Sequence, residues 1–252
     1  MKIKSIVAGN WKMNKMAKEG KIFVRDVMNL LLDIQEVSVI FAPPFTGLRD
    51  INVNPPFFKA AQNCYWEDKG AFTGEISAQM IKDCGADFII LGHSERRHLF
   101  NESNRLINKK IKASLKNELN VIHCIGETLE DRNSGKTVSI LEQQLTDGLE
   151  DIASLDKLVI AYEPVWAIGT GLSATLEQIE DTHRSIRDIL SKLFDNEQNV
   201  SILYGGSVNC DNAETLINAK GVDGFLIGGA SLDAENFASI IKIVEHIQMR
   251  KI

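Results

Sequence analysis

The stretch FIILGHSERRHLFNESNRLINKKIKASLKNELNVIHCIGE, residues 88–127, decides the fold class of this chain. It starts with the short apolar run Phe88–Leu91 and ends with a second such run, Val121–Ile125. Between them, the segment Ser103–Leu115 places leucine and isoleucine at the spacing of one helix face. Short runs without polar alternation are typical of strands buried on both faces of a parallel sheet. The stretch therefore predicts a strand, a helix and a second strand parallel to the first.

The same unit of a strand followed by a helix recurs eight times along the chain, the number found in a closed α/β barrel. The short apolar runs are Ile3–Ala8, Val37–Ala42, Phe57–Ala61, Phe88–Leu91, Val121–Ile125, Leu158–Tyr162, Val200–Leu203 and Gly224–Ile227. Amphipathic segments separate them, and Ser173–Phe194 again carries one apolar stripe. Eight units in about 250 residues predict a (β/α)8 barrel of parallel strands ringed by helices. A doubly wound open sheet is the competing fold.

The third unit fits this pattern least well. We expect Asn63–Gly74 to be a loop, followed by only a short helix near Ser77–Cys84. No low-complexity stretch, charge run or Pro/Gly/Ser linker divides the sequence elsewhere. Because α/β barrels commonly reach this length as one unit, we expect a single catalytic domain over residues 1–252.

Composition excludes several classes of function. The formal net charge of -6 disfavours sequence-independent binding of nucleic acid and implies that an anionic substrate is held by local groups. The sequence has no signal-peptide pattern and no run of membrane-spanning length, so we expect a cytoplasmic protein without a membrane partner. The histidines lack the spacing of a metal cluster, and no metal site is predicted. We expect the cysteines to be reduced, since none forms a CxxC pair; they are Cys64, Cys84, Cys124 and Cys210.

Polar and glycine-rich residues follow most of the predicted strands. These segments are Gly9-Asn10-Trp11-Lys12, Gln62-Asn63, Gly92-His93-Ser94-Glu95, Gly126-Glu127, Glu163-Pro164, Gly205-Gly206-Ser207 and Gly228-Gly229. In a barrel the carboxyl ends of all strands meet at one rim, which is where barrel enzymes place their chemistry. The pattern predicts one polar site at that rim.

Glu163 and His93 are candidates for acid–base chemistry at this site. A lone glutamate at a strand end is more often a salt-bridged or capping residue. Here Glu163 precedes Pro164–Gly171, whose stiff start, apolar middle and glycine-rich exit are typical of a lid. His93 stands just before a predicted helix start, where the helix macrodipole favours a neutral imidazole that donates to a carbonyl oxygen. A packed histidine bonded to the backbone is the alternative.

Lys12 and the paired glycines are candidates for binding an anion. Lysines are normally solvated, but Lys12 lies on the predicted rim of an acidic protein, and Glu95 is a plausible ion-pair partner. Gly205-Gly206-Ser207 and Gly228-Gly229 follow the last two strands, the usual phosphate-binding position in this architecture. A single pair of glycines is most often only a turn. No nucleotide-binding motif accompanies them.

Several segments resemble the signature segments of the triosephosphate isomerase family, and they occur in the chain in the order typical of that family. They are AGNWKMN (8–14), AQNCYWEDKGAFTGEIS (61–77), GHSERR (92–97), CIGETLEDR (124–132), AYEPVWAIGTG (161–171), YGGSV (204–208) and FLIGGASL (225–232). The resemblance implies a cofactor-independent isomerase of glycolysis and gluconeogenesis. Such an enzyme interconverts D-glyceraldehyde 3-phosphate and dihydroxyacetone phosphate by proton transfer through an enediolate.

The resemblance also implies roles for single residues. It places Asn10 and Lys12 at the substrate, His93 as the electrophile and Glu163 as the base, with Glu95 in support of Lys12. The backbone N–H groups expected to hold the phosphate are those of Gly169, Ser207, Gly228 and Gly229. The resemblance further implies a homodimer in which the loop around Thr73 reaches into the partner.

Two departures from the family pattern concern the lid. Leu172 stands where many relatives have lysine, and Leu176 where many have proline, so lid energetics could differ here while the chemistry is kept. The nearest rival function is that of another phosphate-binding barrel enzyme, such as a sugar-phosphate epimerase. A non-enzymatic binding role is a further alternative, alone or beside catalysis.

Overall fold

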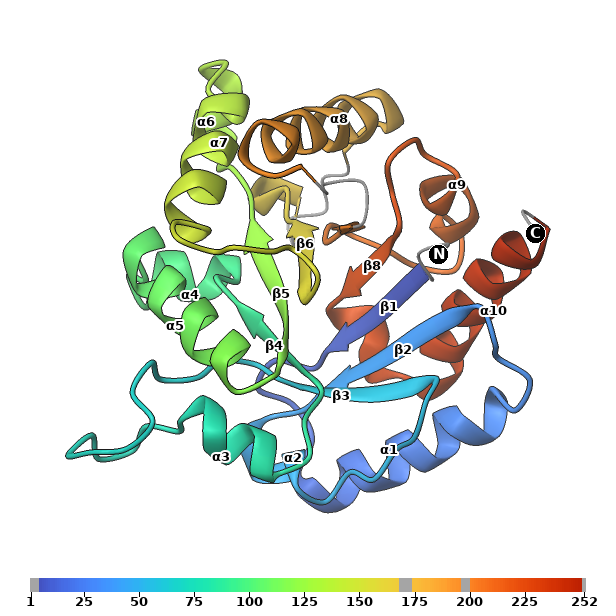
Figure 1. The fold of residues 1–252 in the computed structure, drawn as a ribbon. Helices are drawn as coiled ribbons and strands as arrows, with labels where there is room; N and C mark the ends of the chain where they lie inside the picture. Colours follow the sequence, from blue (N-terminus) through green and yellow to red (C-terminus); the bar gives the residue numbers. More distant parts are fainter. Residues whose placement is uncertain (1–4, 168–173, 196–199, 251–252) are drawn as a thin grey trace.

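The computed structural model describes residues 5–167, 174–195 and 200–250. Eight parallel strands form a closed barrel in chain order, as the sequence predicts, and the open doubly wound sheet is excluded (Figure 1). The strands are β1 (Ser5–Asn10), β2 (Val37–Ala42), β3 (Phe57–Ala61), β4 (Phe88–Leu91), β5 (Asn120–Ile125), β6 (Leu158–Tyr162), β7 (Ser201–Tyr204) and β8 (Gly224–Ile227). The barrel closes where β1 pairs with β8, in the register Ile6 with Gly224.

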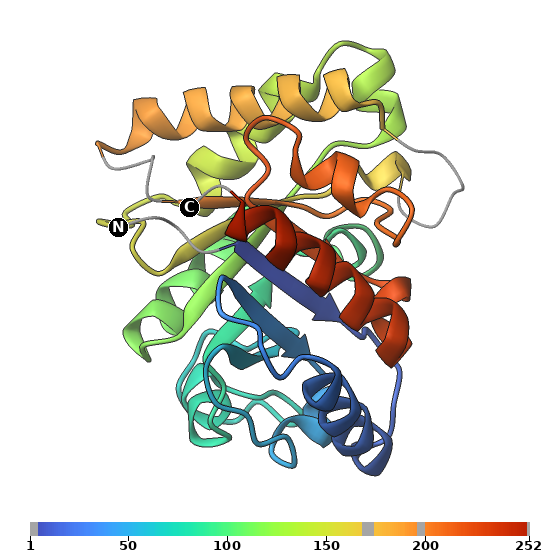
Figure 2. The same cartoon turned by 90° about the vertical axis from the view of Figure 1, so that its right-hand side faces the viewer.

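Helices cover the outside of the barrel. They are α1 (Ala17–Leu30), α2 (Phe45–Leu48), α3 (Ala78–Asp83), α4 (Ser94–Leu99), α5 (Asn104–Lys116), α6 (Leu129–Asn133), α7 (Thr137–Gly148), α8 (Leu176–Leu193), α9 (Ala213–Ile217) and α10 (Ala234–Met249). Two short 3-10 helices, η1 (Val165–Ala167) and η3 (Gly229–Leu232), follow β6 and β8. Figure 2 shows α10 lying along the outside of β1. In the described ranges no helix is both long enough and apolar enough to cross a membrane.

Local sequence signals explain where the two predicted helices begin. Ser103 caps α5 by accepting a hydrogen bond from the backbone N–H of Leu106. Thr175 caps α8 and forms a reciprocal capping box with Gln178. Each cap satisfies a backbone donor that the helix itself leaves open. The predicted start of the second helix at Ser173 lies outside the described ranges.

Strand boundaries differ from the prediction by one or two residues at the rim. Strand β1 continues through Gly9 to Asn10, which pairs with Ala42 of β2. Strand β7 ends at Tyr204 rather than at Leu203. Residues 63–74 form neither helix nor strand, as predicted for the weak third unit. The polar residue Asn10 is therefore held by the sheet itself and is not on a loop.

Two apolar clusters fill the molecule, one inside the barrel and one between the barrel and its helices. The inner cluster alternates small and branched side chains, which lets facing strands interdigitate. Its members are Ile6, Ala8, Ile40, Ala42, Ala60, Ile90, Ile122, Cys124, Val159, Ala161, Leu203 and Leu226. Lys59 of β3 is an unpredicted exception, since it is buried and its ammonium donates to the carbonyls of Leu48 and Ile51.

Two buried histidines make the stability of the fold depend on pH. Burial lowers the pKa of His123 to about 3, and the charge of Arg97 acts in the same direction. Burial lowers the pKa of His183 to about 4, although its ring is hydrogen-bonded to the carbonyl of Gly221. In the unfolded chain these two histidines take up protons near pH 6.5, whereas in the folded protein they do so only at much lower pH. Stability is therefore fully present above pH 6.5 and is lost as the pH falls toward 4.

We expect the free energy of unfolding to fall by about 2 kcal/mol per buried histidine between pH 7.5 and pH 5. His123→Leu should remove about half of the combined loss, while His98→Gln, at an exposed position, should leave the whole loss in place. Urea unfolding at both pH values and one fixed protein concentration measures these differences. An unchanged pH difference in His123→Leu would show that His123 does not contribute.

Candidate active site

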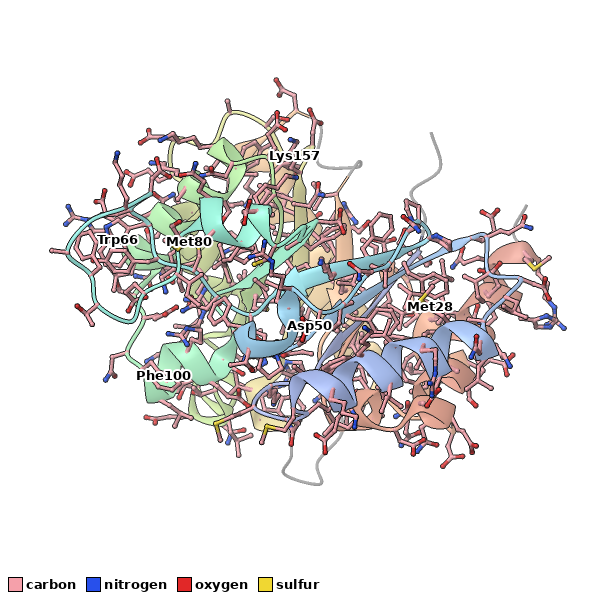
Figure 3. All side chains as sticks on the ribbon, turned by 90° about the horizontal axis from the view of Figure 1, so that it is seen from below. Met28, Asp50, Trp66, Met80, Phe100 and Lys157 are labelled. Carbon is pink, nitrogen blue, oxygen red and sulfur yellow. The ribbon has the colours of Figure 1, made fainter. Side chains whose placement is uncertain are left out.

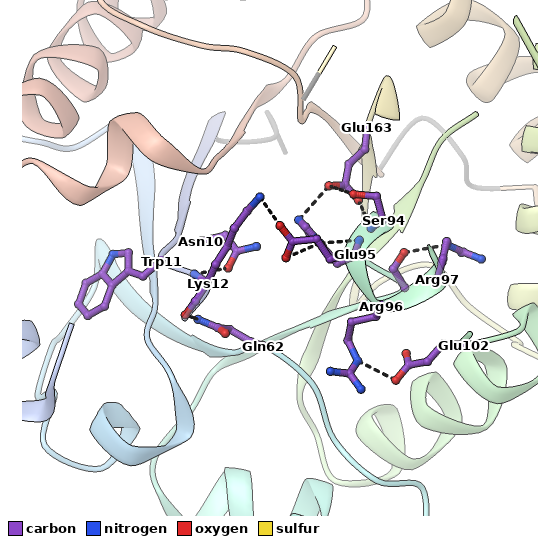
Figure 4. A network of polar contacts seen from close by, with 12 residues as sticks. Asn10, Trp11, Lys12, Gln62, Ser94, Glu95, Arg96, Arg97, Glu102 and Glu163 are labelled. Atoms are coloured by element: carbon purple, nitrogen blue, oxygen red, sulfur yellow. Dashed lines mark hydrogen bonds and ion pairs between the residues drawn. The ribbon is translucent and has the colours of Figure 1, made fainter. Parts of the chain in front are cut away.

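A cavity of about 290 Å³ opens at the carboxyl ends of the strands. Its lining brings together the predicted site residues Asn10, Lys12, His93, Glu163, Ser207, Gly228 and Gly229. Gly169, the remaining predicted phosphate donor, lies outside the described residues, as do residues 168–171 of the predicted lid and Leu172. Side chains that are far apart in the sequence thus converge on one rim, as predicted, and Figure 4 shows several of their contacts.

Glu163 is buried directly after β6 and is held from two sides. Its carboxylate accepts a hydrogen bond from the backbone N–H of Ser94 at 3.0 Å, and the hydroxyl of Ser94 lies 3.4 Å away. The imidazole Nε2 of His93 lies 3.0 Å from Oε1 of the same carboxylate. Burial raises the pKa of Glu163, but His93 and the N–H of Ser94 outweigh burial, and the pKa is lowered. Glu163 is therefore an ionised, desolvated carboxylate.

Two glycines allow the chain to pack this closely around Glu163. A Cβ at position 126 would lie 1.8 Å from the carbonyl oxygen of Glu163. A Cβ at position 205 would lie 3.0 Å from the Cγ of Glu163. Both glycines follow strands that neighbour β6 in the barrel. A side chain at position 126 would collide with the backbone of Glu163, and one at position 205 would press on its side chain.

His93 lies just before α4 and uses both ring nitrogens. Its Nδ1 accepts a hydrogen bond from the backbone N–H of Glu95 at 3.3 Å, which places a single ring proton on Nε2, facing Glu163. Burial lowers the pKa of His93, but the charge of Glu163 outweighs burial, and the pKa is raised. The acceptor role of Nδ1 is that of a neutral ring, the form expected from the helix start. The contact of Nε2 with Glu163, not visible in the sequence, acts in the opposite direction and favours the charged form.

Lys12 occupies a constrained position at the edge of the cavity. Its backbone has a φ of 53°, a conformation that costs a non-glycine residue about 1 kcal/mol or more. The backbone N–H donates to the side chain of Asn10, and the carbonyl accepts from Gln62. Its Nζ lies 2.6 Å from Oε1 of Glu95, so the expected ion pair forms (Figure 4). These contacts fix the direction of the ammonium group.

The opposite wall of the cavity is built from the turns after β7 and β8. Ser207 donates its hydroxyl to the carbonyl of Ala167, the last residue of the first, described part of the predicted lid. The side chain of Asn212 donates to the carbonyl of Ser207. A Cβ at Gly229 would meet no atom of the described residues within 4 Å, so they leave the space beside this backbone open. An anion can approach the main chain here at the side of the cavity away from Glu163.

Ser94, Gln62 and Glu127 take part in the site but had no assigned role from the sequence. The carboxylate of Glu127 is buried, and its Oε1 accepts hydrogen bonds from the side chains of Arg132, Tyr162 and Trp166. It therefore connects β5, β6 and η1 behind the cavity. The sequence signals for Glu127 were its place in the strand-end segment Gly126-Glu127 and in the family segment CIGETLEDR. Of the two departures from the family pattern, Leu176 is the one among the residues that the structure describes. It is the first residue of α8 and is 42% exposed.

A second hollow, of about 300 Å³, adjoins the active-site cavity. It shares Asn10, Lys12 and His93 with that cavity, and its outer part carries the exposed side chains of Met13 and Phe100. The loop of residues 63–74 projects from the body of the molecule between β3 and α3 (Figure 1). Figure 3 shows Trp66 of this loop and Phe100 on the same side of the barrel, and Thr73 on the loop is exposed.

Comparisons with known proteins agree along nearly the whole chain. The family model described as triosephosphate isomerase matches residues 5–244. The triosephosphate isomerase of Chloroherpeton thalassium is 48% identical over 250 residues, which are 96% of this chain and 99% of that protein. That of Geotalea uraniireducens is 42% identical over 253 residues, with the same coverage of 96% and 99%. The crystal structure of triosephosphate isomerase from Bartonella henselae superimposes with a TM-score of 0.88 at 36% identity, covering 96% of this chain and 99% of that one.

Proposed function

The chain belongs to the triosephosphate isomerase family, and from this premise we propose how its residues move the proton. It is an isomerase that interconverts D-glyceraldehyde 3-phosphate and dihydroxyacetone phosphate. We propose that Glu163 is the base that transfers a proton between C1 and C2. The observation that carries this proposal is the desolvated Glu163 carboxylate, 3.0 Å from His93 in a cavity that Lys12 also lines.

The difference in acidity between the substrate carbon and the Glu163 carboxyl group determines what the other residues must contribute. A proton on the carbon beside a carbonyl is far less acidic than that of a free glutamic acid, whose pKa is about 4.3, so its transfer to a carboxylate is strongly unfavourable in water. A carboxylate performs this transfer only where the enediolate is stabilised at the same time. His93 and Lys12 donate toward the two substrate oxygens in a cavity poor in water, where such contacts are strong. Asn10 orients Lys12 by accepting its backbone N–H.

Substrate binding also determines the charge on His93. The contact with the Glu163 carboxylate raises the pKa of the ring in the ligand-free site. A substrate whose carbon lies against Glu163 and whose oxygen lies against Nε2 separates these two groups. The ring then loses the partner that favours its charged form, while Nδ1 keeps the N–H of Glu95. We infer that His93 is neutral in the complex and donates its single proton to the substrate oxygen.

The phosphate is proposed to lie against the turns after β7 and β8. Ser207, Gly228 and Gly229 line that wall of the cavity, and the space beside Gly229 is open. Gly169, from the family pattern, is proposed to add a further backbone donor. Lid closure over the site excludes water, strengthens the base and retains the reactive enediolate phosphate.

A steady-state assay with glyceraldehyde 3-phosphate tests this function against that of a sugar-phosphate epimerase of similar fold. We expect rapid formation of dihydroxyacetone phosphate without any added cofactor, and inhibition by a phosphate-bearing analogue of the enediolate. Turnover of a pentose phosphate epimer pair with no triose turnover would contradict the proposal.

We also propose that the whole chain is one catalytic domain, that it acts in the cytoplasm in glycolysis and gluconeogenesis, and that it forms a homodimer. The pairing of β1 with β8 supports a single unit.

The hollow beside the active site, with exposed Met13 and Phe100 at its outer part, is suited to receive the loop around Thr73 from a second copy. Gel filtration should show a species of about twice the chain's 28.0 kDa, and Thr73→Arg should shift it toward the monomer.

A further inference from the structure

Lys15 joins the loop that carries Lys12 to the turn that follows β8. Its Nζ donates a hydrogen bond of 2.7 Å to the carbonyl of Leu232. Leu232 is the last residue of η3, the 3-10 helix that starts at Gly229. The two residues are 217 positions apart in the sequence, so the contact spans the seam where the barrel closes. Lys15 itself does not line the active-site cavity.

The ammonium group of Lys15 is held by aromatic rings as well as by this hydrogen bond. Its ammonium lies 4.2 Å from the ring centroid of Phe23 and 5.8 Å from that of Trp11, both in the outer apolar cluster. Cations are attracted to the faces of aromatic rings at these distances. Burial lowers the pKa of Lys15, while the charges of Glu19 and Asp233 act in the opposite direction. The surroundings therefore position one charged donor and aim it at the carbonyl of Leu232.

The backbone of Lys15 has an unfavourable conformation. Its φ is 69°, a conformation that residues other than glycine, asparagine and aspartate adopt only at a cost. Lys12, three residues earlier, is also at positive φ. Strained residues of this kind persist where surrounding contacts over-determine them, and they gather at functional sites. At position 15 these contacts come from the side chain, which glycine would not provide.

We propose that Lys15 is a positioning residue that fixes the turn at Gly228 and Gly229 relative to the ammonium of Lys12. The proposal rests on the proposed function, in which that turn holds the phosphate and Lys12 faces the substrate oxygen. A Cβ at Gly228 would lie 3.5 Å from the Cε of Lys12, so the turn lies close to the lysine, with room for little more than a methyl group between them. Any drift of η3 therefore changes the distance between the two groups that bind opposite ends of the substrate.

Three substitutions separate this role from simple support of the fold. Lys15→Met keeps an apolar stem on Phe23 but deletes the donor to Leu232. Lys15→Gly also deletes the donor but relieves the backbone strain. Lys15→Arg keeps the charge and a donor. Glu118→Gly is the matched control, because Glu118 is exposed, has a φ of 59° and lies at the opposite end of β5 from the rim.

The measurements are KM and kcat for glyceraldehyde 3-phosphate, the inhibition constant of inorganic phosphate, and the thermal midpoint. In Lys15→Met and Lys15→Gly we expect KM and the inhibition constant to rise about fivefold, with kcat reduced less than twofold. Lys15→Arg should restore most of the loss, and Glu118→Gly should change neither constant. A lowered thermal midpoint with unchanged KM and phosphate inhibition would overturn the proposal. Absence of isomerase activity in the unsubstituted protein would instead refute the proposed function.

Discussion

Replacing Glu163 by glutamine is expected to lower kcat about 10⁴-fold, the upper range for removal of a general base. The amide has nearly the shape of the carboxylate and keeps an oxygen for the N–H of Ser94, which now holds Glu163 at 3.0 Å. It cannot accept the proton, so binding is largely kept while the chemical step is lost. KM should therefore change far less than kcat, and circular dichroism should show an unchanged fold.

Glu163→Asp is the matched control, because it keeps the charge and alters only the position of the carboxylate. The shorter side chain withdraws the base by about 1 Å, a displacement that can cost on the order of 10²-fold in rate. Thermal unfolding of both variants checks that the buried site tolerates each side chain. A Glu163→Gln enzyme within tenfold of normal turnover would show that another group removes the proton.

The second large effect is expected at Lys12. Lys12→Met should lower kcat/KM about 10³-fold, comparable to the loss of one donor that stabilises a developing oxyanion. Among the described residues that line the cavity, Lys12 is the one lysine or arginine. The chain carries a net charge of -6, so its overall field does not attract the phosphate. Removal of Lys12 also leaves the carboxylate of Glu95 without its 2.6 Å partner, and that charge then repels the substrate.

Two further variants separate local from global charge. Lys18→Met makes the same change in net charge on an exposed position of α1, and it should leave kcat/KM unchanged. Lys12→Arg keeps the charge but places it on a larger, planar group, so partial activity is expected. Equal losses in the Lys12 and Lys18 variants would show that only the global charge matters, and the assigned role of Lys12 would be wrong.

The sequence was sufficient to predict the barrel and most of its rim. Local patterns determine the strands: apolar runs such as Leu158–Tyr162 have few alternatives to a buried strand. Once the strands are parallel and closed, geometry brings their carboxyl ends together, and Glu163, His93 and Lys12 must then lie near one another. This inference needed no knowledge of side-chain conformation, and the lining of the cavity agrees with it.

The charge on His93 shows where such inference ends. The sequence indicates the helix start beside His93, which favours a neutral ring, but not the distance of 3.0 Å to Glu163, which raises the pKa. The positions of Ser94 and Gly126 are similar cases. Their roles depend on contacts with Glu163, a residue 69 positions away from Ser94. Contacts of this kind are set by tertiary packing, and no spacing in the sequence encodes them.

Isotope exchange with the solvent tests the central claim, proton transfer by Glu163, most directly. Dihydroxyacetone phosphate is converted in D2O, and the deuterium content at C2 of the aldehyde product is measured by proton NMR. Because a carboxyl proton exchanges with solvent during the lifetime of the enediolate, a substantial fraction of the product should carry deuterium at C2. Glu163→Gln should slow the exchange and the turnover by the same large factor, about 10⁴-fold. A product free of deuterium, or exchange at the normal rate in Glu163→Gln, would contradict this account.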